Sequence, residues 1–293
     1  MQQLSEPDDF ATEVGHDVVR FPTRSGVHLP TDFSAQVADL LAADPPAGIR
    51  TYAIRDVFVL EVGSRLSDVV KDLDRALQMA LAEGPHGVVC DLTAVLEWTE
   101  PGAVEVLAAA GRYVRNWPGI PVALACPDQV VREFLAADPM GEHLILTASM
   151  FSAVSAVLAT PTVPVERLRL TPDPTSARGA AREFVAATLL GWNLETLTMA
   201  AGLVTGELVS SAMIQAVTDI EVSVAWNLGE LRLTVRDDGP GLPPPPYAHD
   251  DPHGRKLSVV AVLSRAFGVL PTVDGGKVVW AVLNAAGSRP PRQ

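Results

Sequence analysis

The sequence predicts an α/β fold with two sheets, an N-terminal layer of interleaved strands and helices and a C-terminal helix–sheet sandwich. Three observations support this. The chain has 293 residues, which is enough for two ordinary domains. Between residues 50 and 159 short apolar runs alternate with amphipathic stretches, a pattern typical of a largely parallel sheet. After residue 166 two helical stretches precede segments of period-two alternation, which indicates antiparallel strands.

Proline placement marks the expected domain boundary. Pro161, Pro164, Pro172 and Pro174 interrupt the pattern, so the linker is expected at 160–165. The organisation predicted from this boundary is an N-terminal extension with one helix at 1–45, an α/β layer at 50–159, the linker at 160–165, a sandwich at 166–285 and a tail at 286–293.

The elements of the N-terminal layer follow from hydrophobic spacing. Apolar side chains recur every four residues across 67–82, which predicts a helix with one buried face. Asp128 is the expected N-cap of a helix that continues to Leu135. The remaining expected elements are one long strand or a bent pair over 52–62, strands at 87–92, 120–126 and 144–147, and helices at 32–43, 102–114 and 150–158.

In the C-terminal half, a strand and two helices are expected before a hairpin, a third helix and a closing strand. Gly191 is predicted to close a first helix over 176–190, and Asn193 to cap a long helix over 194–218. The turn at 227–229 predicts a hairpin. The other expected elements are strands at 167–171, 220–226, 231–236 and 277–283 and a helix over 257–267.

Composition limits the partners and the compartment. The formal net charge is −13 and no cluster of Lys and Arg occurs, so nucleic acid and anionic membranes are poor partners and a protein surface is expected. The acidic N-terminus does not resemble a signal peptide, which favours a cytoplasmic location. Cys90 and Cys126 each lie in an apolar run, and both are expected to be buried thiols.

One candidate site follows the predicted strand at 231–236. Asp237 stands at the end of this strand, where a carboxylate accepts hydrogen bonds from a buried donor. Gly239 and Gly241 allow the backbone to approach a flat ligand closely. Without further context, an Asp-Gly turn stiffened by proline explains the same residues equally well.

The surrounding motifs favour the ligand. Glu207 and Ser211 lie upstream on the long predicted helix, and Gly254 to Lys256 opens a helix downstream. In this order, the stretch from Leu168 to Leu283 resembles the GHKL ATPase superfamily, whose Bergerat fold is an α/β sandwich, and within it the bacterial anti-sigma-factor serine kinases. The resemblance implies that ATP or ADP binds here.

The same resemblance implies a role for each matching residue. Asp237 would hold the adenine amino group, Gly239 and Gly241 would form the pocket wall, and Glu207 would act as general base. The segment 242–254, with Gly254 at its end, would form a lid over the phosphates.

Two residues depart from the family pattern. Ser211 stands where the family has the Asn that binds magnesium, and a serine hydroxyl is about one atom too short for the octahedral geometry that Mg²⁺ requires. Lys256 replaces a lid glycine, and its ammonium group either hinders closure or balances phosphate charge in place of the metal. Nucleotide binding is therefore expected to persist, with weak or absent phosphoryl transfer.

The N-terminal layer resembles a STAS domain, the fold of anti-sigma-factor antagonists. The resemblance rests on the segments 88–93, 98–102 and 122–127. Thr99 and Glu100 stand where antagonists carry Asp-Ser-Ser-Gly, so Glu100 replaces the phosphorylated serine. Glu100 either mimics the phosphate in part or simply favours the helix N-terminus that Thr99 caps, and Thr99 is a possible substitute acceptor.

Both resemblances together imply a regulator of partner switching in bacteria. Its partner would be a sigma factor or a STAS or anti-sigma-type protein, and a homodimer is possible. Two alternatives stay open: an active kinase that phosphorylates a separate STAS antagonist, and a scaffold that binds no nucleotide. The lid residues His249, Asp250, Asp251 and His253 could bind a transition metal, although a polar lid explains them more simply.

Overall fold

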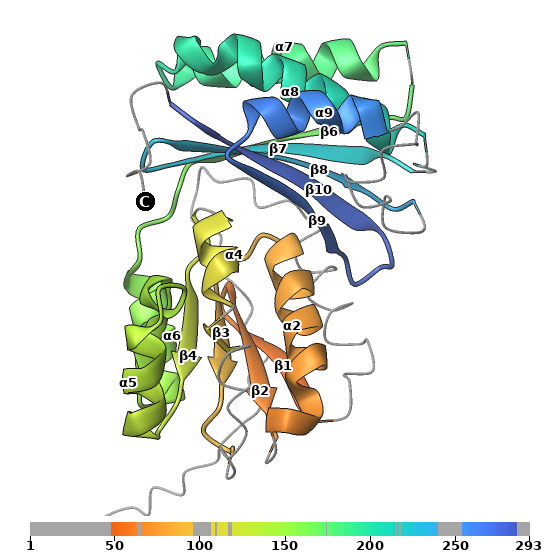
Figure 1. Ribbon diagram of the computed structural model, residues 1–293. Coiled ribbons are helices and arrows are strands. Elements are labelled where there is room, and N and C mark those ends of the chain that lie inside the picture. The colour runs from red at the N-terminus through yellow and green to blue at the C-terminus, as the bar shows by residue number, and fades with distance from the viewer. Residues whose placement is uncertain are drawn as a thin grey trace, which may run out of the picture.

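The computed structural model describes residues 48–63, 66–95, 107–108, 110–116, 119–173, 175–214, 216, 218–239 and 254–285. These residues form two five-stranded sheets with helices packed on them, one sheet in each half of the chain (Figure 1). The predicted α/β class is therefore confirmed. The expected helix at 32–43 lies outside the described residues.

The N-terminal sheet has the strand order β1-β2-β3-β4-β5, and all neighbours except the first pair are parallel. The segment expected to be one strand or a bent pair is an antiparallel hairpin that turns at Arg55, whose φ is 56°. The other three strands confirm their predictions within two residues at either end. The strands are β1 (Ile49–Ile54), β2 (Val57–Val62), β3 (Gly87–Asp91), β4 (Val122–Ala125) and β5 (Ile145–Thr147).

The helices of the N-terminal half cover both faces of this sheet. Asp128 caps α5 as predicted, because its Oδ1 accepts from the backbone N–H groups of Val130 at 2.8 Å and Val131 at 3.1 Å. Of the helix expected over 102–114, residues 107–108 are helical and α4 begins at Gly111 after a turn at Ala110, while 102–106 lie outside the described residues. Gly111 lies so close to the Met140 carbonyl that a Cβ would clash. The helices are α2 (Leu66–Ala82), α4 (Gly111–Asn116), α5 (Gln129–Ala137) and α6 (Met150–Ala159), with a 3₁₀ turn η1 (Gly141–His143).

The C-terminal sheet is antiparallel throughout, with the order β6-β7-β8-β10-β9. The predicted hairpin is confirmed: β7 and β8 are joined at Leu228 and Gly229, whose positive φ values of 47° and 89° match a tight turn. The strands are β6 (Val165–Leu170), β7 (Ile220–Asn227), β8 (Glu230–Asp237), β9 (Ala266–Pro271) and β10 (Lys277–Asn284).

Three helices cover one face of the C-terminal sheet (Figure 1): α7 (Ala177–Gly191), α8 (Thr198–Ala212) and α9 (Gly254–Leu263). A 3₁₀ turn, η2 (Glu195–Leu197), precedes α8. Among the helices that the structure describes, none has the length and apolar character needed to cross a bilayer.

The predicted boundary between the first two of these helices was wrong. Asn193 does not cap the second helix, because it has a φ of 57° and ends the first one. Leu194 donates to the Leu189 carbonyl at 2.8 Å and Asn193 donates to the Leu190 carbonyl at 3.2 Å, which is the Schellman pattern. Asn193 therefore takes the terminating role that was assigned to Gly191.

The helix expected over 257–267 was also wrong at its end. It stops at Leu263, and Ala266 to Pro271 form the edge strand β9 beside β10. The Arg265 N–H donates to the Val282 carbonyl at 2.7 Å at the start of this pairing. The long-range pairing with β10 overrides the weak local helix signal.

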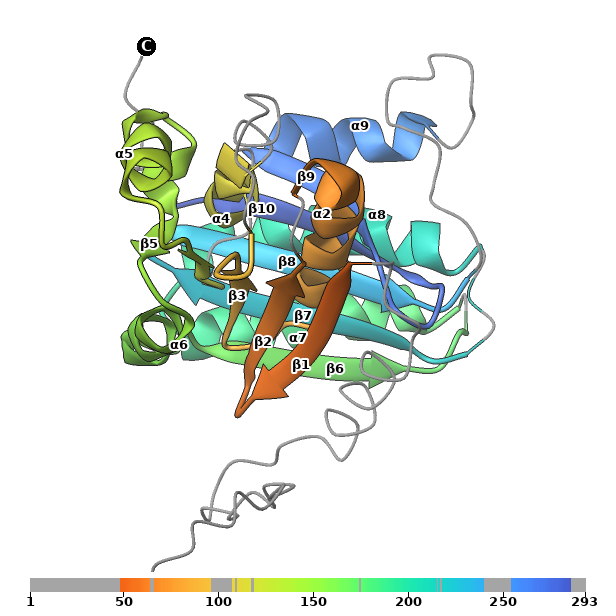
Figure 2. The ribbon, with the colours of Figure 1, turned by 90° about the horizontal axis from the view of Figure 1, so that it is seen from below.

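The other face of the C-terminal sheet packs against the N-terminal half. Leu270, Val278, Trp280 and Val282 belong to the same buried cluster as the apolar face of α2 and the strands β2 to β4. Both views place α2 beside the strands β9 and β10 (Figures 1 and 2). The C-terminal sheet is thus enclosed between its own helices on one face and the N-terminal half on the other.

Both cysteines are free and fully buried, as predicted. Burial raises the pKa of the Cys90 thiol to about 12, so little of the reactive thiolate forms at neutral pH. We expect neither thiol to react with Ellman's reagent in the native protein and both to react after unfolding in guanidinium. Labelling of two thiols within minutes in native buffer would contradict this burial.

Candidate functional site

Asp237 lies at the end of β8, on the face of the sheet that the helices cover. The side chains of Leu231, Leu233 and Val235 alternate with it and belong to the core beneath α7, α8 and α9. The Asp237 side chain is 0% exposed. A charged group in an otherwise apolar strand face is costly unless it is paired, so its partners decide its role.

The two carboxylate oxygens of Asp237 have different surroundings. Oδ1 accepts from the Lys277 ammonium at 2.7 Å and from the Gly239 backbone N–H at 2.9 Å. Oδ2 is buried and has no hydrogen-bond partner among the residues that the structure describes. Burial raises the pKa of Asp237, while Lys277 and the Gly239 N–H act in the opposite direction.

Lys277 is a residue of this site that the sequence reasoning missed. It begins β10 and stands directly opposite Asp237 in the antiparallel register, with its side chain 3% exposed. Its Nζ also donates to the Gly239 carbonyl at 3.3 Å. The available signal was a lone lysine at the start of a strand that is otherwise apolar through Leu283.

Glu207 and Ser211 lie on α8, which packs against both β8 and α9. The Glu207 Oε1 pairs with the Arg178 guanidinium of α7 at 2.8 Å, and the Glu207 side chain is 18% exposed. Ser211 is half-buried on the last turn of the helix. One oxygen of the expected general base is therefore already engaged by a cation.

The remaining predicted residues divide into two groups. Gly254 begins α9, and Lys256 falls in the first turn of that helix. The described part of the chain thus brings Glu207, Ser211, Asp237, Gly239 and the start of α9 onto adjoining elements. The other predicted positions lie outside the described residues: Thr99, Glu100, Gly241 and the lid cluster His249, Asp250, Asp251 and His253.

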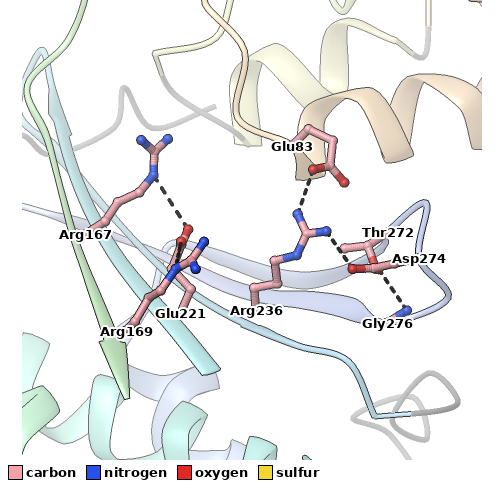
Figure 3. Close-up of polar contacts among 8 residues, drawn as sticks. All are labelled: Glu83, Arg167, Arg169, Glu221, Arg236, Thr272, Asp274 and Gly276. Atoms are coloured by element: carbon pink, nitrogen blue, oxygen red, sulfur yellow. Dashed lines mark hydrogen bonds and ion pairs between the residues drawn. The ribbon is translucent and has the colours of Figure 1, made fainter. Parts of the chain in front are cut away.

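An ion-pair network lies on the opposite face of β8, between the two halves of the chain (Figure 3). Arg236, the neighbour of Asp237, pairs with Glu83 after α2 at 2.7 Å and with Asp274 before β10 at 2.9 Å. The Thr272 hydroxyl also donates to Asp274, which in turn accepts from the Gly276 N–H at 3.2 Å. We call Glu83, Arg236 and Asp274 the interdomain clamp.

Burial and ion pairing act in opposite directions on the pKa of each group in the clamp. Burial raises the pKa of Glu83, whose side chain is 1% exposed, although Arg236 opposes the shift. Burial also acts to raise the pKa of Asp274, but the hydrogen bonds from Thr272 and Arg236 outweigh it and the pKa is lowered. Burial acts to lower the pKa of Arg236, but Glu83 and Asp274 together outweigh it and the pKa is raised, so Arg236 keeps its positive charge between the two carboxylates.

The site offers one buried hydrogen-bond acceptor that has no partner among the described residues. A buried carboxylate oxygen without a partner suits a neutral N–H donor such as the amino group of adenine. Among the described residues, no group of three or more His, Cys, Asp and Glu side chains could hold a metal ion. Ser211 and Glu207 offer a hydroxyl and a carboxylate that already pairs with Arg178.

No protein-family model matches the chain, and no curated protein does. Among solved structures, the chain is similar to the protein TM1081, with 16% identity and a TM-score of 0.31, over 38% of this chain and 88% of that one. It is also similar to the histidine kinase domain of the blue-light-activated histidine kinase EL346 from Erythrobacter litoralis, with 14% identity and a TM-score of 0.27, over 87% and 93% of the two chains.

Proposed function

We propose that the chain is a bacterial partner-switching regulator that binds ATP or ADP in its C-terminal half and acts chiefly by protein–protein binding. Its N-terminal half serves as an antagonist-like STAS module. Phosphoryl transfer by the C-terminal half is weak or absent. The partner is a sigma factor or a STAS or anti-sigma-type protein.

One observation carries the nucleotide part of this proposal. The Asp237 carboxylate is fully buried at a strand end, yet its Oδ2 has no partner among the described residues. A buried acceptor left unpaired costs about 1–3 kcal/mol, so such an atom is expected where a ligand supplies the donor. Gly239 beside it offers backbone without a side chain in the way.

Weak kinase activity is supported by α8. A general base has to present a free oxygen to the hydroxyl of its substrate, whereas Oε1 of Glu207 is held by Arg178 at 2.8 Å. Ser211 supplies only a short hydroxyl at the position of the family's magnesium ligand. Both features favour binding over transfer.

Regulation within the chain is supported by the interdomain clamp. Arg236 and Asp237 are consecutive residues of β8 whose side chains lie on opposite faces of the sheet, toward Glu83 and toward Lys277 respectively. Asp274, in the turn between β9 and β10, pairs with Arg236, and Lys277, the first residue of β10, pairs with Asp237. A shift at the nucleotide site therefore has a short physical route to the N-terminal half.

Titration calorimetry of the full chain with ATP and with ADP, each with and without Mg²⁺, tests the proposal. We expect saturable binding of both nucleotides and an effect of Mg²⁺ on the dissociation constant of less than about tenfold, because the metal ligand is altered. Absence of binding at millimolar nucleotide would contradict the proposal and favour a scaffold. Transfer of labelled phosphate from ATP to a STAS antagonist would favour the active kinase instead.

A further inference from the structure

A buried ion pair closes one side of the candidate nucleotide site. Lys277 and Asp237 face each other across β10 and β8, with Nζ and Oδ1 2.7 Å apart and side chains 3% and 0% exposed. The pair lies on the face of the sheet that carries the helices, since Val279 and Ala281 alternate with Lys277 and belong to the core beneath them. It is therefore part of the site rather than of the interdomain clamp.

The pair leaves a specific pattern of hydrogen-bonding groups. Oδ1 already accepts two hydrogen bonds, from Lys277 and from the Gly239 N–H. The Lys277 ammonium donates in addition to the Gly239 carbonyl at 3.3 Å, which fixes the loop next to the carboxylate. Only Oδ2 lacks a partner within the described part of the chain.

We propose that Lys277 determines the base specificity of this site: by holding Oδ1 it leaves Oδ2 as the acceptor for one amino donor, and the site selects a 6-aminopurine nucleotide. This inference rests on the proposed nucleotide binding. Lys277 acts through Asp237 and is a positioning residue. A purine without the amino group leaves Oδ2 buried and unpaired, so it binds more weakly.

The charge of Lys277 is as important as its position. Burial raises the pKa of Asp237, and the neighbouring Asp238 carboxylate acts in the same direction, whereas Lys277 opposes both. Without the ammonium group, a protonated Asp237 becomes populated. A protonated carboxyl group donates a hydrogen bond to the N1 acceptor of a purine and no longer needs the amino group.

The test compares ATP with purine riboside 5′-triphosphate, which differs from ATP only in lacking the 6-amino group. We expect wild type to prefer ATP by about 10- to 100-fold, as for a hydrogen bond to a charged group. In Lys277→Met the preference is expected to fall below about threefold at pH 6 and to recover in part at pH 9, as Asp237 ionises. An Arg50→Met variant, which removes an exposed cation far along the chain, should show the wild-type preference at both pH values.

Several results would overturn the inference. Equal affinity of wild type for the two nucleotides would overturn it while leaving nucleotide binding intact, and this result needs no variant to fold. An undiminished preference for ATP in folded Lys277→Met would do the same. If Lys277→Met no longer unfolds cooperatively, Lys277→Gln replaces it, because its neutral amide still donates to Oδ1 without carrying a charge. An unchanged preference for ATP in Lys277→Gln that does not depend on pH would overturn the role of the charge. Failure of wild type to bind either nucleotide would overturn the proposed function as well.

Discussion

Replacing Arg236 with methionine is expected to lower the free energy of unfolding by about 3–5 kcal/mol. The variant removes the cation that faces Glu83, whose side chain is 1% exposed, and leaves a buried carboxylate without its main partner. Asp274 loses its contact with the same guanidinium. Equilibrium unfolding in urea, followed by circular dichroism, measures the change.

The chain offers a matched control for this experiment. Arg50 pairs with Glu61 at 3.4 Å, but its side chain is 77% exposed, so Arg50→Met is expected to cost less than about 1 kcal/mol. The double variant Arg236→Met/Glu83→Leu should recover most of the loss, because the remaining carboxylate, Asp274, is 44% exposed to solvent. An Arg236→Met effect no larger than that of Arg50→Met would show that the clamp does not hold the two halves together.

The clamp also predicts a dependence of stability on pH. The pKa of Glu83 in the folded state lies above its ordinary value of 4.5 because of burial. The stability that this group contributes is therefore fully present below pH 4.5 and is lost as the pH rises through the raised pKa. Arg236→Met removes the opposing charge, so we expect the loss of stability with rising pH to extend to higher pH in the variant than in wild type, measurable by urea unfolding over a series of pH values.

Replacing Asp237 with asparagine is expected to weaken ATP and ADP binding by about 10- to 100-fold. The asparagine keeps the size of the side chain but loses the charge that pairs with Lys277, and its amide presents a donor as well as an acceptor. Calorimetry on the folded variant, with the melting temperature as a check of integrity, measures the effect. A loss of affinity for both nucleotides by the same factor would place the effect at the base, which they share.

Asp238 provides the control for this second variant. It is the adjacent carboxylate, and its Oδ1 accepts from the Thr218 N–H at 3.2 Å. Asp238→Asn should leave both dissociation constants within about threefold of wild type, since its carboxylate points to the chain before β7. Equal effects of the two substitutions would mean that the charge of the segment, and not the Asp237 carboxylate itself, matters for binding.

Much of the fold could be predicted because local signals and tertiary structure agree. The apolar spacing across α2, the Asp128 cap and the Leu228–Gly229 turn each act over a few residues. The wrong predictions concern Asn193 and Ala266 to Pro271. Asn193 ends α7 instead of capping the next helix, and Ala266 to Pro271 pair with β10, which comes later in the chain.

Only the residues of the candidate site that belong to sequence motifs could be predicted. Asp237, Gly239 and Glu207 carry motif signals in sequence order, whereas Lys277 enters the site because β8 and β10 are neighbours in the sheet. The pairing of Arg178 with Glu207 likewise depends on how α7 packs against α8. Contacts between residues 29 or 40 positions apart leave no local pattern, so a single sequence cannot reveal them.

Hydrogen exchange of the full chain with and without saturating ATP tests the central claim most directly, that a nucleotide site in the C-terminal half is linked to the N-terminal half. We expect ATP to slow exchange at the end of β8 and the start of β10, and also at the end of α2 next to Glu83. The second effect should disappear in Arg236→Met while the first remains. Unchanged exchange at Asp237 and Lys277 in the presence of millimolar ATP would contradict the account.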